Sequence, residues 1–367
     1  MAIPPNGTER VTAAGVSIWL DDLSRTLLES GGLRDLIAER NVVGVTTNPT
    51  IFAAAIGNDF SYQRQVRQLA SEGKDVEQIA FRLITDDVRA ACDVLRDTHI
   101  LSRGRDGWVS VEVDPRLAHD ADATIVQAQQ LASVVDRPNV MIKIPATDEG
   151  LIAIRQTIAL GISVNVTLIF GVQRYLQVVD AYLSGLEQAA KDGLDLALIH
   201  SVASFFVSRV DAEVSGRLGA SSPLVGKVAI ANALTAYQAF LEAFRTERAR
   251  DLQSIGANVQ RPLWASTAVK NLALPAALYV IGLVAPSTVS TISPATLEAV
   301  GEASEPISET IQSNLDSACS SMAKLSQEGV SIADVARVLE AQGVDKFQSS
   351  WKELLASVSS AIGDKKQ

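Results

Sequence analysis

The segment Val140-Met-Ile-Lys-Ile-Pro-Ala-Thr-Asp-Glu-Gly150 has the pattern of a short strand followed by a helix, and the prediction of the fold starts from it. Its β-branched and apolar residues suit a buried strand, Pro145 ends that strand, and Thr147 begins a pattern typical of a first helical turn. The strand contains Lys143, although lysine is almost never fully buried without a reason. Either the side chain extends to water from the strand end, or it is a desolvated amine that can attack a carbonyl group.

The same alternation of short apolar segments with helical stretches runs through most of the chain, without an internal repeat. Strands that alternate with helices predict a parallel sheet, and eight of them predict an α/β fold closed as a (β/α)8 TIM barrel. An open doubly wound sheet is the alternative, but neither the glycine fingerprint of a dinucleotide site nor a Walker loop is present. Besides the strand that contains Lys143, we expect strands at residues 16–21, 42–47, 108–113, 162–168, 200–205, 262–266 and 278–283.

The domain organisation follows from this pattern. Residues 1–12 contain Pro4, Pro5 and Gly7 and are predicted to be a flexible leader. Residues 13–367 are predicted to form a single barrel domain, which includes C-terminal helices from about residue 295.

The last predicted helix, at residues 332–361, carries two features. Gly343 is expected to end or kink its first half. The residues beyond it repeat apolar side chains at helical spacing, and this apolar face should dock on the barrel. Its members are Phe347, Trp351, Leu354 and Val358.

Composition restricts the class of protein. A hydrophobic content of 47% provides ample core, and a formal net charge of −10 argues against nucleic acid and anionic membrane surfaces as partners. The three histidines lack the spacing of metal ligands, so neither a metal nor another cofactor is predicted. The N-terminus does not resemble a signal peptide and no apolar run is long enough to span a membrane, which predicts a cytoplasmic protein.

Polar residues recur at the carboxyl ends of the predicted strands, where barrel enzymes carry their functional groups. Each residue alone has an ordinary explanation, such as a helix cap or a turn. Their coincidence at seven strand ends favours a site. These residues are Asp21, Thr46, Asn48, Glu112, Lys143, Asn165, Thr167, Ser204 and Ser266.

A lysine with two carboxylates, several hydroxyl and amide groups and no metal suits Schiff-base chemistry on a carbonyl compound. The amine attacks a ketone, and the iminium then accepts electrons while a carbon–carbon bond breaks. One carboxylate takes the proton of the hydroxyl group whose bond cleaves. Arg209 near the barrel mouth is placed to bind a phosphate, and Lys270 to assist it.

Six segments in order resemble the signature blocks of the transaldolase family, most closely its longer, actinobacterial form. The resemblance covers roughly residues 15 to 360. The segments are Gly44-Val-Thr-Thr-Asn-Pro-Thr-Ile-Phe52, Val109-Ser-Val-Glu-Val-Asp-Pro-Arg-Leu-Ala118, Asn139-Val-Met-Ile-Lys-Ile-Pro-Ala-Thr147, Gly161-Ile-Ser-Val-Asn-Val-Thr-Leu-Ile-Phe170, His200-Ser-Val-Ala-Ser-Phe-Phe-Val-Ser-Arg-Val-Asp211 and Leu263-Trp-Ala-Ser266.

The resemblance implies a barrel of the class I aldolase type. It also implies the transfer of dihydroxyacetone from sedoheptulose 7-phosphate to glyceraldehyde 3-phosphate, in the non-oxidative pentose phosphate pathway. Its partners would be small sugar phosphates. The sequence does not decide between a monomer and a homodimer.

The resemblance also assigns roles by position in the motifs. Lys143 would form the Schiff base, Asp21 would be the acid and base of bond cleavage, and Glu112 with Thr167 would hold the catalytic water. The shorter family members have an arginine soon after the seventh-strand serine, where Lys270 is the nearest cation here. The remaining substrate-binding residues would be Thr46, Asn48, Asn165 and Ser204 for the dihydroxyacetone part, Phe206 for the pocket wall, and Arg209 with Ser266 for the phosphate.

Two other functions are alternatives. An aldolase of the same superfamily would release free dihydroxyacetone, but such enzymes are shorter and usually carry glutamine where Glu112 stands. A barrel that binds sugar phosphates without catalysis would be expected to lose the lysine or a carboxylate, and Lys143, Asp21 and Glu112 are all present.

Overall fold

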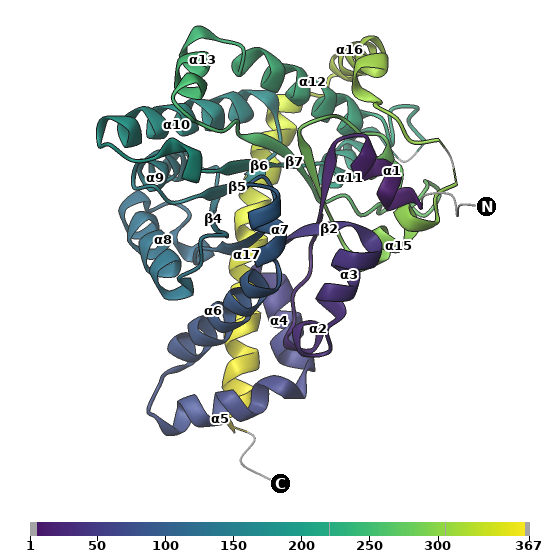
Figure 1. The fold of residues 1–367 in the computed structure, drawn as a ribbon. Helices are drawn as coiled ribbons and strands as arrows, with labels where there is room; N and C mark the ends of the chain where they lie inside the picture. The colour runs from purple at the N-terminus through teal and green to yellow at the C-terminus, as the bar shows by residue number, and fades with distance from the viewer. Residues whose placement is uncertain (1–5, 220, 305, 364–367) are drawn as a thin grey trace, which may run out of the picture.

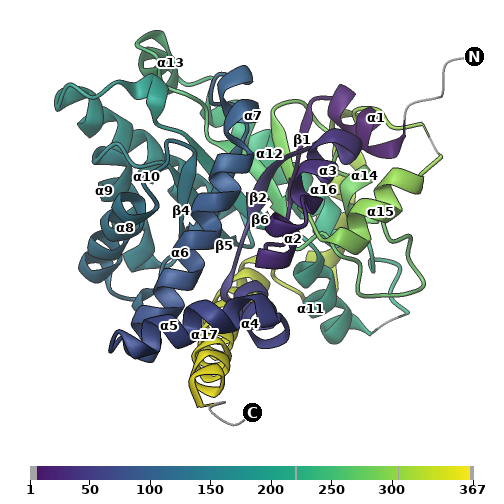
Figure 2. The same cartoon turned by 60° about the horizontal axis from the view of Figure 1, so that its bottom comes forward.

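The structure, a computed structural model, describes residues 6–219, 221–304 and 306–363. Eight parallel strands form a closed barrel in which each strand pairs with the next and β8 pairs with β1, so the predicted (β/α)8 barrel is confirmed (Figures 1 and 2). The strands are β1 Val16–Leu20, β2 Val42–Thr46, β3 Trp108–Glu112, β4 Val140–Pro145, β5 Val164–Ile169, β6 Ser201–Phe206, β7 Arg261–Ala265 and β8 Thr288–Ile292.

Helices surround the barrel and connect its strands (Figure 1). They are α1 Gly7–Ala13, α2 Arg25–Glu29, α3 Gly32–Arg40, α4 Pro49–Asn58, α5 Gln63–Ser71, α6 Val76–Val94, α7 Arg96–Leu101, α8 Ala121–Val135, α9 Asp148–Ala159, α10 Val172–Lys191, α11 Ser208–Leu218, α12 Val228–Ala243, α13 Glu247–Ser254, α14 Leu278–Ile281, α15 Pro294–Glu302, α16 Ile311–Gln327 and α17 Ile332–Gly363, with short 3-10 turns η1 Phe60–Tyr62, η2 Pro115–Leu117 and η3 Leu196–Leu198. Among the described residues, no helix is both long and apolar enough to cross a membrane.

The barrel lumen is filled by every second residue of each strand, as the strand period of two requires. On β1 the inward residues are Ser17, Trp19 and Asp21, which follows the last residue of the strand. The fully buried Trp19 ring lies against the backbone of Gly44, where a Cβ atom would come within 2.6 Å of the indole. Glycine at this position of β2 therefore makes room for the tryptophan that fills the middle of the lumen.

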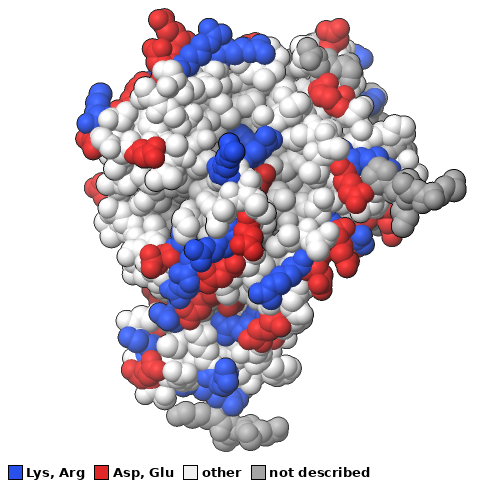
Figure 3. Space-filling model, in the orientation of Figure 1, with Lys and Arg blue, Asp and Glu red and all other residues white. Residues whose placement is uncertain are grey.

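The amino-terminal end of the barrel is closed by charged and polar side chains. Arg261 donates from Nη1 to Ser17 Oγ at 2.8 Å and pairs with Asp106 at 3.0 Å. Arg103 and Arg105 line a cavity of about 220 Å³ beside it, and basic side chains gather near the centre of this face in Figure 3. A substrate must therefore enter the lumen from the opposite, carboxyl-terminal end.

The eighth strand was predicted at the wrong segment. Residues 278–281 form the short helix α14, and β8 is Thr288–Ile292. A short apolar run such as Leu278-Tyr-Val-Ile does not reveal by its period whether it is strand or buried helix. The β-branched residues Thr288, Val289, Thr291 and Ile292 favour the strand.

The N-terminal segment also differs from its prediction. Residues 7–12, expected in a flexible leader, belong to α1, which begins with a capping box between Asn6 and Glu9. Thr8 and Val11 of this helix are buried, so this part of the segment is structural. Residues 1–5 lie outside the described residues.

Helix α17 crosses the carboxyl-terminal mouth of the barrel, in contact with α11 on one side and with α4, α5 and α6 on the other (Figure 1). Its predicted apolar face is confirmed as buried, from Phe347 to Val358. The helix does not end at Gly343, because it is continuous from residue 332 to 363. Gly343 instead permits close packing, since a Cβ atom there would lie 2.8 Å from Leu168 Cδ2.

We predict that Gly44→Ala lowers the free energy of unfolding by about 1–3 kcal/mol, because the added methyl group forces the buried Trp19 ring to move. The matched control is Gly216→Ala in α11, where a Cβ atom has no neighbour within 4 Å and alanine should stabilise the helix by up to about 1 kcal/mol. Urea unfolding followed by tryptophan fluorescence measures both. Equal stability of Gly44→Ala and the parent chain would contradict the packing described for the lumen.

Candidate active site

Strand register places three functional side chains in one row at the mouth of the barrel. Lys143 of β4 is level with Glu112 of β3 on one side and with Asn165 of β5 on the other. Because residues in register on neighbouring strands point to the same face, all three side chains enter the lumen. The row is the direct result of closing these strands into a barrel.

Lys143 is buried, with only 5% of the residue exposed. Its Nζ donates to the carbonyl oxygen of Thr47 at 3.0 Å, lies 3.7 Å from Glu112 Oε2, and lies 5.7 Å from the centre of the Phe347 ring. An ammonium group over an aromatic face at this distance is attracted by the ring. The structure thus decides against a side chain that extends to bulk water, and leaves an amine enclosed by acids and an aromatic ring.

Asp21 is held at the end of a chain of hydroxyl groups. Its Oδ1 accepts a hydrogen bond from Thr46 Oγ1 at 2.7 Å, and Thr291 Oγ1 lies 2.5 Å from the same Thr46 oxygen. Because the Thr46 proton goes to Asp21, the Thr291 hydroxyl is the donor of the second bond. Some of the Asp21 surface faces the cavity, yet protein atoms surround its carboxyl group. This burial raises the pKa of Asp21, opposed by the Lys143 ammonium and by Thr46.

Glu112 is the second carboxylate beside Lys143. Burial raises the pKa of Glu112 to about 7, although the Lys143 ammonium lowers it. Its Oε2 and the Thr167 hydroxyl are both buried and have no hydrogen-bond partner among the residues that the structure describes. A carboxyl group with a pKa near 7 can both give and take a proton close to neutral pH.

Asn165 is fixed by two hydrogen bonds in the lumen. Its Oδ1 accepts from Ser204 Oγ at 2.7 Å, and its Nδ2 donates to Ser110 Oγ at 2.9 Å. Both partners are buried. The network therefore fixes the orientation of the amide and leaves Asn165 Nδ2 one further N–H to donate.

A cavity of about 250 Å³ opens above this row of residues. It brings together eight of the predicted site residues with groups that the sequence did not indicate. Its lining includes Asp21, Thr46, Asn48, Lys143, Ser204, Phe206, Arg209 and Ser266, together with Thr50, Ile51, Ala265, Thr291, Lys346 and Phe347.

The phosphate-binding candidates lie on the β6 and β7 side of this cavity. The guanidinium of Arg209 lies 5.5 Å from the centre of the Phe206 ring. Ser266 has a left-handed backbone with φ of 54°, and its hydroxyl lies 3.0 Å from Ser208 Oγ. Lys270 is exposed and outside the residues that line the cavity.

One predicted residue, Asn48, also has the ordinary role considered for it. Asn48 caps α4, because its side chain accepts from the amide of Ile51 at 3.1 Å. Asp22, which adjoins Asp21, is absent from the cavity lining, so the strand period distinguishes the two neighbouring carboxylates.

Six lining residues were not among the predicted site residues, and three of them, Thr291, Lys346 and Phe347, bear on the chemistry of the cavity. Thr291 was hidden by the misplaced eighth strand, and its β-branched context was the signal that could have found it. Lys346 and Phe347 belong to α17, whose apolar period predicts docking but does not indicate what lies below the helix.

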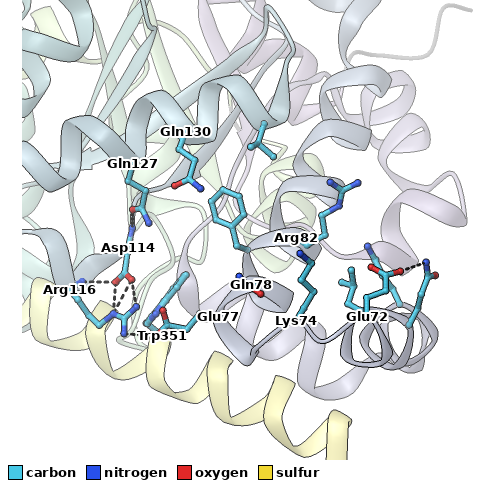
Figure 4. A pocket seen from close by; sticks show the side chains of 15 residues that line it. Glu72, Lys74, Glu77, Gln78, Arg82, Asp114, Arg116, Gln127, Gln130 and Trp351 are labelled. Atoms are coloured by element: carbon cyan, nitrogen blue, oxygen red, sulfur yellow. Dashed lines mark hydrogen bonds and ion pairs between the residues drawn. The ribbon is translucent and has the colours of Figure 1, made fainter.

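A larger cavity, of about 610 Å³, lies elsewhere, between α5, α6, α8 and α17. Figure 4 shows this groove, in which Arg116 turns back to pair with Asp114 and Trp351 of α17 forms one wall. The groove holds none of the predicted site residues. The smaller cavity is the better candidate because it combines a buried amine, Lys143, with a carboxyl group of raised pKa, Asp21, and Glu112 lies beside that amine. The described residues contain no group of three or more histidine, cysteine, aspartate or glutamate side chains placed to hold a metal ion.

Comparison with known proteins agrees with this geometry. The family model described as Transaldolase/Fructose-6-phosphate aldolase matches residues 18–358. The chain is 54% identical over 360 residues to Transaldolase of Mycolicibacterium smegmatis, which covers 97% of this chain and 97% of that protein. It is 52% identical over 362 residues to Transaldolase 1 of Streptomyces coelicolor, covering 97% and 95%. It is 51% identical over 360 residues to Transaldolase of Kocuria rhizophila, covering 97% and 98%.

We predict that Glu112→Gln becomes more stable relative to the parent chain as the pH rises. The pKa of Glu112 in the folded state, about 7, is above its ordinary value of 4.5. Its contribution to stability is therefore complete below about pH 4.5 and is lost as the pH rises through 7. The difference in unfolding free energy should change by at most about 3 kcal/mol between pH 4.5 and 8, measured by urea unfolding at each pH.

The control for this prediction is Glu328→Gln, at the exposed C-terminal end of α16. A surface substitution of this kind should change stability by less than about 0.5 kcal/mol at every pH. If the change in unfolding free energy relative to the parent chain were the same for both variants and independent of pH, the pKa of Glu112 would not be raised by burial.

Proposed function

This chain belongs to the Transaldolase/Fructose-6-phosphate aldolase family and is a transferase with transaldolase function, and we propose that it acts through a Schiff base on Lys143. The donor would be sedoheptulose 7-phosphate and the acceptor glyceraldehyde 3-phosphate. The products would be erythrose 4-phosphate and fructose 6-phosphate. One observation carries the proposal: a buried lysine amine lies 3.7 Å from Glu112 and shares the cavity at the open end of the barrel with Asp21, and the pKa of both carboxyl groups is raised.

In the first step the Lys143 amine attacks the carbonyl carbon of the ketose. A carbinolamine forms, loses its hydroxyl group as water and becomes an iminium ion. Glu112, 3.7 Å from the amine and with a pKa of about 7, is suited to protonating the departing hydroxyl. The Thr167 hydroxyl, which has no hydrogen-bond partner among the described residues, would hold the water together with Glu112.

In the second step Asp21 removes the proton from the hydroxyl group on the departing carbon of the bond that breaks, and this carbon becomes the aldehyde carbon of the leaving aldose. The electrons of the carbon–carbon bond move into the iminium, which becomes an enamine, and an aldose leaves. The raised pKa of Asp21 makes its ionised form a stronger base. The acceptor aldehyde then enters, and the same group returns the proton as the new bond forms. Hydrolysis of the iminium releases the product ketose from Lys143.

The remaining side chains would orient the substrate. Asn165 has a free N–H in the lumen and is fixed by Ser204, while Thr46 and Asn48 stand on the β2 side of the cavity. These groups suit the hydroxyls of the dihydroxyacetone unit, with Phe206 as a wall. Arg209 and Ser266, with Lys270 nearby, would bind the phosphate at the β6 and β7 side.

Transfer is favoured over release of free dihydroxyacetone by the cover above the amine. Phe347 of α17 lies against Lys143, and a covered enamine is protected from water until an aldehyde arrives. Glu112 also replaces the glutamine that we expect in enzymes of the releasing type.

We place this reaction in the non-oxidative pentose phosphate pathway of the cytoplasm, with small sugar phosphates as partners. A net charge of −10 supports a role without nucleic acid.

We predict that borohydride reduction in the presence of fructose 6-phosphate leaves a three-carbon adduct on Lys143. Peptide mass mapping locates it, and the other lysines should remain unmodified because they lack acid and base partners. Lys143→Met is the control and should give no adduct. An adduct on another lysine, or none on the parent chain, would refute the mechanism.

We predict that Asp21→Ala separates the two steps. Schiff-base formation should persist, because Lys143 and Glu112 remain, while transfer should fall by about 10²–10⁴-fold with the loss of the base. Reduction by borohydride should then trap the uncleaved six-carbon ketose on Lys143. Equal loss of trapping and transfer would argue against a separate role for Asp21.

A further inference from the structure

Helix α17 presents two successive side chains to the cavity, Lys346 and Phe347. Phe347 is explained by its contact with Lys143. Lys346 is not part of the reacting row, which lies on β3, β4 and β5, and the basic groups whose charges act on it are Arg209 and Lys270. A lysine at the mouth of an active-site cavity requires its own explanation.

The position of Lys346 is fixed by the packing of its helix. Residues 343, 347 and 350 recur at helical spacing on the face that meets the barrel. Gly343 lies against Leu168, Phe347 is buried, and the Ser350 hydroxyl lies 2.7 Å from Thr50 Oγ1. Lys346 is three residues after Gly343 and four before Ser350, so it stands at the edge of this face. The backbone from which its side chain reaches into the cavity is therefore held in place on both sides.

Three cations come together here without an acid to balance them. Arg209, Lys270 and Lys346 form no ion pair with a carboxylate among the described residues. The pKa of Lys346 is lowered by burial and then by the positive charges of Arg209 and Lys270, while the one carboxylate that opposes this, Glu353, has the smallest effect. Mutual repulsion of this kind is relieved when an anion binds between the cations.

The Arg209 side of the cavity also offers groups that suit a phosphate. Arg209 holds a planar guanidinium against the Phe206 ring, and the Ser266 hydroxyl lies beside Ser208. An arginine grips two phosphate oxygens, whereas a lysine supplies a point charge with three rotatable donors. A second cation on the opposite side of the anion would complete the grip.

We propose that Lys346, from the C-terminal helix, is the second phosphate-binding cation of this site. It lines the same cavity as Arg209 and Ser266, and with them it selects phosphorylated aldehydes and ketoses. This inference rests on the proposed function for its substrates. It assigns to Lys346 the task that the sequence had suggested for Lys270, which is exposed and outside the cavity lining. Specificity for the phosphate thus depends on a residue that lies outside the barrel strands.

The direct test is the binding of inorganic phosphate, measured by calorimetry on the parent chain and on Lys346→Met. Loss of one charge-assisted contact should weaken phosphate binding by about ten- to a hundredfold. Lys346→Arg keeps the charge and should restore most of the affinity. Lys352→Met is the matched control, since Lys352 is exposed on the same helix six residues further on and should bind phosphate as the parent chain does.

The kinetic test compares glyceraldehyde 3-phosphate with D-glyceraldehyde as acceptors. Lys346→Met should raise KM for the phosphorylated acceptor by about ten- to a hundredfold, and its effect on the unphosphorylated one should be at least about tenfold smaller. Lys270→Met is measured in parallel. The proposal is overturned if Lys346→Met leaves phosphate affinity intact, if only Lys270→Met weakens it, or if both acceptors are affected equally.

These outcomes are distinct from those that test the proposed function. Phosphate binding needs no turnover, and borohydride trapping on Lys143 needs no Lys346. A parent chain that binds phosphate through Lys346 but forms no adduct would refute the Schiff-base mechanism alone. A parent chain that forms the adduct while Lys346→Met binds phosphate normally would refute the present inference alone.

Discussion

The burial of Lys143 together with two carboxyl groups, Glu112 and Asp21, is the interaction on which the site depends. Removing one positive and two negative groups from water has a large desolvation free energy, and the electrostatic attraction between the groups offsets it only in part. Burial raises the pKa of both Asp21 and Glu112, so the protonated forms become accessible near neutral pH. The burial that is unfavourable for these charged groups is therefore also what allows two carboxyl groups to gain and lose protons beside an amine. Hydrogen bonds from Thr46 and to the Thr47 carbonyl hold this charged group in one arrangement.

The closed barrel makes this arrangement possible because every second side chain of each strand must point into the lumen. Glu112, Lys143 and Asn165 are far apart in the chain but level in register. Below them, Trp19 fills the lumen against Gly44, and Arg261 closes the amino-terminal end with Asp106. These lower layers leave one opening, at the carboxyl-terminal mouth, and they support the reacting row from beneath. Stability and function are thus divided along the axis of the barrel.

Most of this architecture could be predicted from local sequence because it depends on local chemistry. Strands rich in β-branched residues, each ending in a polar group, indicated the barrel and seven of its eight strand ends. The eighth failed because the run at 278–281 is apolar without a decisive period, and the true strand at 288–292 brings Thr291 into the hydrogen-bond chain of Asp21. The prediction of a flexible leader at residues 7–12 was wrong for a related reason. Proline and glycine suggested a loop, whereas Asn6 and Glu9 form a helix cap that only their spacing reveals.

The contribution of α17 could not be predicted, because it depends on how distant parts of the chain meet. Its apolar period predicts that Phe347, Trp351, Leu354 and Val358 are buried, but not which surface they cover. Docking onto the barrel mouth places Phe347 against Lys143 and brings Lys346 to the cavity. The burial that stabilises the helix and the geometry that completes the site are then the same contacts. Loosening of α17 would uncover the amine and withdraw Lys346 together, which couples protection of the bound intermediate to the grip on the phosphate.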